Sequence, residues 1–144
     1  MQLGEKVEIP ASPEDAIIDA VRNKYGAGLY VARFVVHEFT SLCPVTGQPD
    51  FAKFIIDYIP DDLLIESKSL KLFLGSFRNH KDFHEHCTTH IGERLFMAAG
   101  PHYMRIAAYW RVRGGISIDV FWEKGHANGI TLPDNSVHML ERQS

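Results

Sequence analysis

The stretch from residue 29 to residue 59, LYVARFVVHEFTSLCPVTGQPDFAKFIIDYI, contains two strand-like segments joined by a short polar loop. Leu29 to Glu38 and Phe51 to Ile59 are both rich in β-branched and aromatic residues, which favour strands. The loop between them contains two prolines and a glycine, which are typical of turns. The stretch therefore predicts two strands, with Cys43 and Asp50 at the two ends of the connecting loop.

Two helices and two further strands are predicted after this stretch. From Glu66 to about Arg78, apolar residues recur every three or four positions and define one helical face. From about Asp82 to Ala98 the apolar residues have a strict i, i+4 spacing, and a Gly-Pro pair then ends the helix. Tyr103 to Val112 and Ile116 to Trp122 have the composition of strands and are joined by an Arg-Gly-Gly turn.

The order of two strands, two helices and two strands predicts an α+β fold. We expect an antiparallel four-stranded sheet, with the helix pair inserted between its second and third strands and covering one face. Such a sheet has exposed edges, so pairing with other subunits is expected. We treat residues 1–144 as one domain, although residues 1–25 carry only one short helix signal. That signal consists of Ser12 as a cap, Pro13 in the first turn, and Ile17, Ile18 and Val21 on one side.

The composition is that of a globular protein, with 45% hydrophobic and 23% charged residues among 144. A net charge of −3 and an isoelectric point near 6.2 argue against a protein that holds long stretches of nucleic acid. No apolar run approaches the roughly 20 residues that span a bilayer, and the N-terminus lacks the features of a signal peptide. The cytoplasm is therefore the expected compartment. The chain has two cysteines, which are too few for a disulfide framework.

Cys43 is the strongest candidate for a nucleophile. It lies in the loop with Thr40 and Ser41, where hydroxyls and backbone amides can stabilise a thiolate. Asp50 follows across a turn that can bring its carboxyl back towards the sulfur. A thiol paired with a carboxylic acid suits addition to an electrophilic carbon, provided that burial or a negative neighbour raises the pKa of Asp50. The alternative is that Cys43 is a small core residue.

Cys87 and the histidines around it allow two interpretations besides simple packing in the apolar stripe of the second helix. His80 and His84 have the i, i+4 spacing of metal ligands, and so do His86 and His90. The two pairs, however, point to different sides of the helix. Alternatively, His84 and Glu85 face a pocket, where a carboxylate can accept two hydrogen bonds from a guanine-like edge. Spacing alone favours this pocket no more than a solvated helix start.

A basic face on the first predicted helix is a candidate phosphate site. Lys68, Lys71 and Arg78 recur there at helical spacing, although such a face is usually only solvated. The chain has no G-x-G-x-x-G after a strand and no P-loop, so a nucleotide cofactor would be held without a Rossmann fold. Arg113, at the Arg-Gly-Gly turn, offers another cation.

Five stretches of the chain carry a family resemblance: EFTSLCPVTGQPDF (38–51), ESKSLKL (66–72), SFRNH (76–80), FHE (83–85) and RGGISID (113–119). Together they resemble the NADPH-dependent 7-cyano-7-deazaguanine reductases of queuosine biosynthesis, in their single-module form. The E-S-K-S-x-K run is the signature of that family, and the long cysteine loop is at least as specific. The resemblance spans residues from about Leu29 to Asp119.

The resemblance implies a tunnelling fold, in which subunits of a homo-oligomer join their sheets into a barrel and form active sites at subunit interfaces. It also implies the reduction of a nitrile to a primary amine with two NADPH and no metal. Cys43 would add to the nitrile carbon of the deazapurine to give a thioimide, and Asp50 would supply the proton.

The resemblance further assigns binding residues. The positions that it places around the substrate are His84, Glu85, Glu66 and Ser67. The positions that it assigns to the NADPH phosphates are Lys68, Lys71, Arg113 and Gly114. Glu85 would bind the guanine-like edge of the deazapurine, while Glu66 also suits stabilisation of its own helix through the dipole.

Two rival functions compete with the reductase. One is a zinc-dependent hydrolase similar to the GTP cyclohydrolases, with Cys87 and the histidines as metal ligands. The other is a non-catalytic pterin- or purine-binding module, which would not require Cys43 and Asp50. A milder hypothesis is that Cys43 and Cys87 form a disulfide under oxidation.

Overall fold

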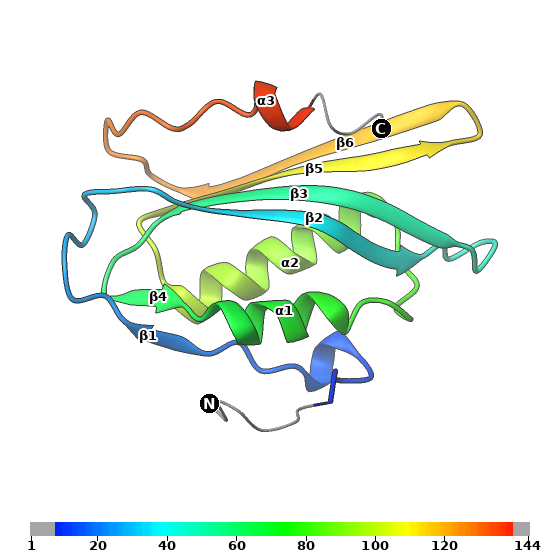
Figure 1. Ribbon diagram of the computed structural model, residues 1–144, viewed down its shortest axis with the longest axis horizontal. Coiled ribbons are helices and arrows are strands. Elements are labelled where there is room, and N and C mark those ends of the chain that lie inside the picture. The colour runs from blue at the N-terminus through cyan, green and yellow to red at the C-terminus, as the bar shows by residue number, and fades with distance from the viewer. Residues whose placement is uncertain (1–7, 140–144) are drawn as a thin grey trace.

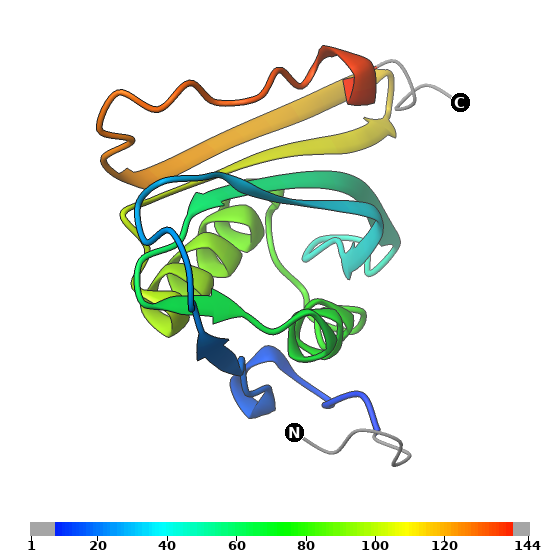
Figure 2. The ribbon, with the colours of Figure 1, turned by 60° about the vertical axis from the view of Figure 1, so that its left-hand side comes forward.

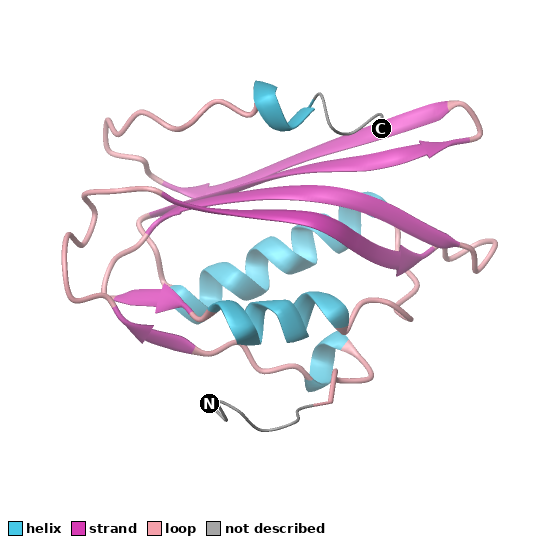
Figure 3. Ribbon diagram, in the orientation of Figure 1, coloured by secondary structure: helices cyan, strands magenta, loops and turns pink. Residues whose placement is uncertain are grey.

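A computed structural model describes residues 8–139 and contains a four-stranded antiparallel sheet with two helices on one face (Figures 1 and 3). The strands are hydrogen-bonded in the order β2 (Ala32–Leu42), β3 (Pro49–Ile59), β5 (Tyr103–Arg113) and β6 (Ile116–Gly125). The helices α1 (Ser67–Gly75) and α2 (His84–Ala99) lie between β3 and β5 in the chain. The predicted α+β class, with antiparallel strands and two helices, is confirmed.

The central strands β3 and β5 are buried on both faces. Phe54 and Ile56 on β3 point into the main core beneath the helices, whereas Ile55 packs with Ala107 and Tyr109 on the opposite face. A strand with two buried faces needs a nearly continuous apolar run rather than an alternating pattern. The run FAKFIIDYI has that composition, and this explains why its strand could be predicted closely.

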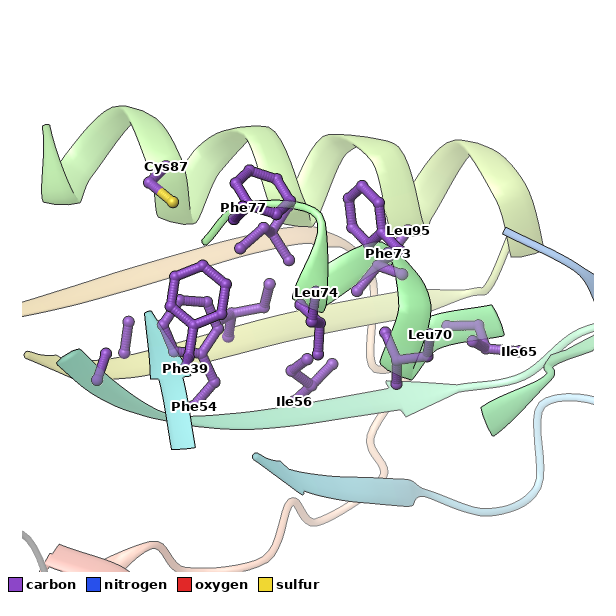
Figure 4. Packing of buried hydrophobic residues seen from close by; sticks show 14 of the residues in the cluster. Phe39, Phe54, Ile56, Ile65, Leu70, Phe73, Leu74, Phe77, Cys87 and Leu95 are labelled. Atoms are coloured by element: carbon purple, nitrogen blue, oxygen red, sulfur yellow. The ribbon is translucent and has the colours of Figure 1, made fainter. Parts of the chain in front are cut away.

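The two helices pack on the sheet through aromatic and aliphatic side chains (Figure 4). Glu66 caps α1, because its carboxylate accepts hydrogen bonds from the backbone amides of Lys68 (2.6 Å) and Ser69 (2.8 Å). The α2 helix ends at Gly100, which has the left-handed φ of 54° that a glycine adopts readily. No helix among residues 8–139 is long and apolar enough to cross a membrane.

The helix predicted from Ser12 to Val21 is wrong. Only a single 3₁₀ turn forms, η1 (Pro13–Asp15), and the chain then extends into β1 (Ala20–Arg22). The β1 strand pairs antiparallel with β4 (Leu63–Ile65), a strand that the sequence did not indicate either. This tertiary pairing overrides the local helix signal. The contact between the two segments continues up to the start of α1, where the amide of Glu66 donates to the carbonyl of Asp19 (2.9 Å).

The segment after β6 covers the sheet face opposite the helices, as Figures 1 and 2 show. The last element that the structure describes in this segment is the short helix α3 (Ser136–Met139). Arg33 on β2 and Arg105 on β5 both donate hydrogen bonds to the carbonyl oxygen of Pro133. Between the two arginines lies Asp57, which is fully buried and contacts both guanidinium groups.

Replacing Gly92 by alanine is expected to destabilise the protein by about 1–3 kcal/mol. Gly92 lies on the buried side of α2, and a Cβ atom there would come within 2.6 Å of the Trp122 ring on β6. Urea unfolding should show a lower midpoint for Gly92→Ala. Thr89→Ala, an exposed position on the same helix, should stay within about 0.5 kcal/mol of the wild type. Equal midpoints for Gly92→Ala and the wild type would contradict this close packing.

Candidate active site

The loop that carries Cys43 is a tight connection between β2 and β3. The amide of Cys43 donates to the carbonyl of Gln48 (2.8 Å), and the amide of Gly47 donates to the carbonyl of Cys43 (2.9 Å). The flanking strands are longer than predicted at this end, so the loop contains only residues 43–48. Asp50 consequently belongs to β3, as the direct partner of Ser41 on β2.

Two β-bulges turn the site residues towards the helices. Between Val36 and Phe39, β2 has one residue more than β3, and this restores Phe39 to the same face as Val36. Between Trp110 and Arg113, β5 likewise has one residue more than β6. Because successive side chains on a strand alternate in direction, this extra residue places Arg113 on the same face as Trp110.

The thiol of Cys43 is half-buried and has a lowered pKa. The hydroxyl of Thr46 contributes most to this shift, followed by the backbone amides of Thr46 and Val45, since each of these donors stabilises the thiolate. The expected help from amides is therefore present, but the hydroxyl is that of Thr46 rather than of Thr40 or Ser41. Ser41 is a fully buried residue of β2, and its hydroxyl lies next to the thiol of Cys87.

Replacing Thr46 by valine is expected to raise the pKa of the Cys43 thiol, because the hydroxyl that stabilises the thiolate is lost. The rate of iodoacetamide alkylation follows the thiolate fraction, so the midpoint of its pH profile should move to higher pH. Thr40→Val, which removes a hydroxyl that donates to the carbonyl of Ser41 (3.5 Å) instead, serves as the control. An unchanged midpoint in Thr46→Val would show that Thr46 does not stabilise the thiolate.

Asp50 is buried and has two partners of positive or ionisable character. One oxygen, Oδ1, accepts a hydrogen bond from Nη1 of Arg113, and the other lies 3.2 Å from Nε2 of His84. The expected burial of Asp50 is thus observed, whereas its charged neighbour is a cation rather than an anion. A carboxylate between a guanidinium and an imidazole can exchange a proton with the imidazole.

His84 begins α2 and is held in a fixed orientation. Its ring stacks on Trp110 with centroids 4.1 Å apart and planes within 2°. The indole N–H of Trp110 donates to the hydroxyl of Thr88 (3.3 Å), which in turn donates to the backbone carbonyl of His84 (2.8 Å). The imidazole is therefore fixed from its face and from its backbone, with Nε2 directed at Asp50.

One cavity of about 320 Å³ is lined by five of the ten residues that were predicted for the site. Its lining includes Cys43, Asp50, His84, Glu85 and Arg113. Sequence reasoning did not single out three neighbours of this group, Thr46, Gln48 and Trp110. Thr46 and Gln48 lie within the matched cysteine loop, but only the folded turn shows which of its side chains approach the thiol.

The residues of α1 and its cap that were predicted to bind substrate or cofactor do not line the Cys43 cavity. Ser67 and Lys71 line a second cavity of about 370 Å³ between α1 and β2, which shares no lining residue with the first cavity. Glu66 directs its carboxylate at the first amides of α1. Arg113, which was grouped with Lys68 and Lys71, lies instead in the cavity of Cys43, and Gly114 follows it in the turn to β6.

Cys87 is a core residue, as predicted. It is fully buried, and burial raises the pKa of its thiol to about 12, so the thiolate that a metal would require is strongly disfavoured. The helical spacing of His80 and His84 is lost because α2 begins only at His84. Among residues 8–139, no three histidine, cysteine or acidic side chains are grouped to hold a metal. Cys43 and Cys87 are both free thiols.

Known proteins resemble this chain along most of its length. A family model described as QueF-like protein matches residues 49–129. A protein of Sinorhizobium medicae strain WSM419, named NADPH-dependent 7-cyano-7-deazaguanine reductase, is 56% identical over 137 residues, or 94% of this chain and 89% of that protein. A protein of the same name from Zymomonas mobilis is 57% identical over 136 residues, or 94% and 92% of the two chains.

A solved structure supports the fold alone. The crystal structure of the archaeosine synthase QueF-Like in the apo form superposes with a TM-score of 0.62 at 22% identity, over 67% of this chain and 94% of that chain.

The family match includes Asp50, His84, Glu85 and Arg113, whereas Cys43 lies before its first residue. With more than half of its length matched by the family model and relatives above 50% identity, this chain belongs to the QueF-like protein family.

Proposed function

We propose that this protein is an NADPH-dependent 7-cyano-7-deazaguanine reductase of queuosine biosynthesis, acting in the cytoplasm. The observation that carries the proposal is the Cys43 thiol, whose pKa is lowered within a cavity that also contains Asp50 and His84. A binding module has no need for an activated thiol beside a proton-exchanging pair. The relatives that carry this name cover nearly the whole chain.

The first step is covalent capture of the nitrile by Cys43. The thiolate sulfur forms a bond to the nitrile carbon, and the nitrogen takes up one proton, which gives a thioimide. His84 and Asp50 are the groups in the cavity that are placed to deliver this proton. Thr46 and the loop amides release the sulfur from their hydrogen bonds as it loses its charge.

The chain then returns the sulfur to its starting state. NADPH, when bound, would supply the two hydrides that the reduction of a nitrile to a primary amine requires. Cys43 leaves as a thiolate, which the Thr46 hydroxyl again stabilises. His84 and Asp50 supply protons to the nitrogen. Overall, one nitrile takes up two hydrides and two protons and becomes a primary amine.

Glu85 is the residue that we assign to recognition of the deazapurine ring. It lies in the first turn of α2, is exposed and lines the Cys43 cavity. A carboxylate at this position can accept hydrogen bonds from an N–H and an exocyclic amine at once. The ring would then be held at one end by Glu85, with its nitrile directed at Cys43.

The basic residues of α1 fit the phosphates of NADPH in chemical character. Lys71 is exposed and lines the second cavity together with Ser67, and Lys68 lies one turn away on the same helix. The first amides of α1 already bind Glu66, so a phosphate would be held by side chains rather than by these amides. We assign Lys68 and Lys71 to the cofactor phosphates on this basis.

We further propose a homo-oligomer with a tunnelling fold, in which sheets of neighbouring subunits join at their edges. The edge strands of the described sheet are β2 and β6, and Ile116 and Phe121 on β6 are each 68% exposed. The two cavities of one chain share no residue, so the α1 lysines and Cys43 would meet across a subunit interface. The likeness to the QueF-Like structure supports the fold of the single subunit.

The deciding experiment follows NADPH absorbance with 7-cyano-7-deazaguanine or GTP as substrate. We expect NADPH to be consumed with the nitrile only, in a ratio of two NADPH per amine formed. Treatment with a chelator should leave this rate unchanged. No loss of NADPH with the nitrile, or turnover of GTP that depends on zinc, would reject the proposed function in favour of the hydrolase.

A further inference from the structure

Arg113 binds the cysteine loop of its own chain. Its two terminal nitrogens have different acceptors: Nη1 donates to Oδ1 of Asp50, and Nη2 donates to Oε1 of Gln48. Nη1 also lies 3.4 Å from the carbonyl oxygen of Pro49. A single guanidinium therefore contacts three consecutive residues at the point where the cysteine loop enters β3.

The bulge in β5 directs Arg113 to this position. With regular alternation, Arg113 would project from the opposite face to Trp110 and away from Asp50. The extra residue between Trp110 and Arg113 brings the arginine onto the face that carries Asp50 and His84. Bulges commonly redirect a side chain beside an active site, and this bulge directs Arg113 towards Asp50 and Gln48.

We propose that Arg113 is a positioning residue for covalent capture of the nitrile, an inference that rests on the proposed function. By holding Oδ1 of Asp50, Arg113 turns the second oxygen towards His84, so that the proton-exchanging pair faces the cavity of Cys43. By holding Gln48, it also fixes the loop residue whose carbonyl accepts the Cys43 amide. Capture then begins from a geometry in which sulfur and proton donor are already in place.

This role differs from phosphate binding in what it requires of the side chain. A cofactor phosphate needs a positive charge, which lysine also provides, whereas bridging Gln48 and Asp50 needs the fork of a guanidinium. It also acts at a different step, because capture of the nitrile requires no NADPH. The two roles can therefore be measured separately on the same variants.

The test measures the rate of adduct formation between the protein and 7-cyano-7-deazaguanine by intact-mass spectrometry, without NADPH. We expect the rate constant to fall about 10- to 100-fold in Arg113→Gln, and Arg113→Lys to remain at least about 10-fold below the wild type. Gln48→Ala, which leaves Arg113 and Asp50 unchanged, should be slowed by a smaller factor. Arg111→Gln removes an exposed arginine of the same strand that contacts Phe51 rather than the loop, and its rate should stay within about twofold.

Alkylation by iodoacetamide separates lost positioning from a lost thiolate. Thr46 and the loop amides lower the pKa of Cys43, so alkylation of Arg113→Lys should proceed at nearly the wild-type rate while capture of the nitrile is slow. Capture at the wild-type rate in Arg113→Gln or Arg113→Lys, with only the KM for NADPH raised, would overturn the inference. Absence of any adduct in the wild type itself would reject the proposed function and the inference together.

Discussion

Cys43→Ala is expected to form no adduct with 7-cyano-7-deazaguanine and to lose NADPH oxidation by a factor of at least about 10⁴. Cys43 is the only thiol that lines the cavity among the described residues. The hydroxyl of Thr46, although adjacent, is far too weak an acid to replace a thiolate near neutral pH. Without the carbon–sulfur bond, the nitrile carbon is not converted to the thioimide that accepts the first hydride.

Cys87→Ala is the matched control for this experiment. Cys87 is fully buried with a pKa of about 12, so it contributes no thiolate near neutral pH. This variant should form the adduct and oxidise NADPH at close to the wild-type rates, at a cost of about 1 kcal/mol in stability from the small cavity. An adduct detected in Cys43→Ala, or lost in Cys87→Ala, would refute the assignment of the nucleophile.

The elements that could be predicted from sequence are those whose buried faces are marked by a run or stripe of apolar residues within the element itself. The β3 and β5 strands are apolar on both sides, and α1 and α2 have apolar stripes that end up in the core. The first strand was predicted to run from Leu29 to Glu38, so that its last two residues were the polar pair His37 and Glu38. These two residues lie in the β2 bulge, after which the strand continues to Leu42.

The short sheet of β1 and β4 could not be predicted for a different reason. Each strand has three residues, and three residues carry no measurable periodicity. Their pairing joins residues more than 40 positions apart in the chain, such as Ala20 and Ile65. The local signal at Ser12 and Pro13 therefore predicted a helix that the tertiary contacts replace after one turn.

The residues of the site also differ in how far the sequence could predict their contacts. Cys43 and Asp50 could be paired from sequence because both lie in one short loop region. The contacts that control them come from other elements: His84 from α2, and Arg113 from β5 through a one-residue bulge. A bulge changes the direction of every later side chain on its strand, and no residue type specifies it. The sequence therefore did not indicate the contact of Arg113 with Asp50, and only the family resemblance assigned Arg113 a role, together with the lysines of α1.

The second large effect is expected from Asp57, which lies far from the chemistry. In the sheet, Asp57 is the direct partner of Arg33 on β2 and of Arg105 on β5. Oδ1 accepts from Nε of Arg33 (2.7 Å), and Oδ2 accepts from Nη2 of Arg33 (3.0 Å) and from Nε of Arg105 (2.9 Å). The carboxylate is fully buried, while the two arginine side chains remain 17% and 25% exposed.

Asp57→Asn is expected to lower the free energy of unfolding by about 3 kcal/mol. The amide keeps the shape of the side chain but removes the negative charge, and its NH₂ group must face a guanidinium donor. Two cations are then left side by side without their counter-ion, and this cost exceeds that of a typical surface pair. Because the arginines also hold the carbonyls of Pro133 and Asp134, hydrogen exchange should increase in the C-terminal segment as well.

Urea unfolding of three proteins tests this prediction: the wild type, Asp57→Asn and Asp61→Asn. Asp61 also contacts a basic side chain, His102 at 3.3 Å, but it is 43% exposed, so its replacement should change stability by less than about 1 kcal/mol. The difference between the two variants isolates the effect of burial, because both substitutions exchange the same carboxylate for the same amide. Equal midpoints for the two variants would show that the Arg33–Asp57–Arg105 cluster contributes no more to stability than a surface ion pair.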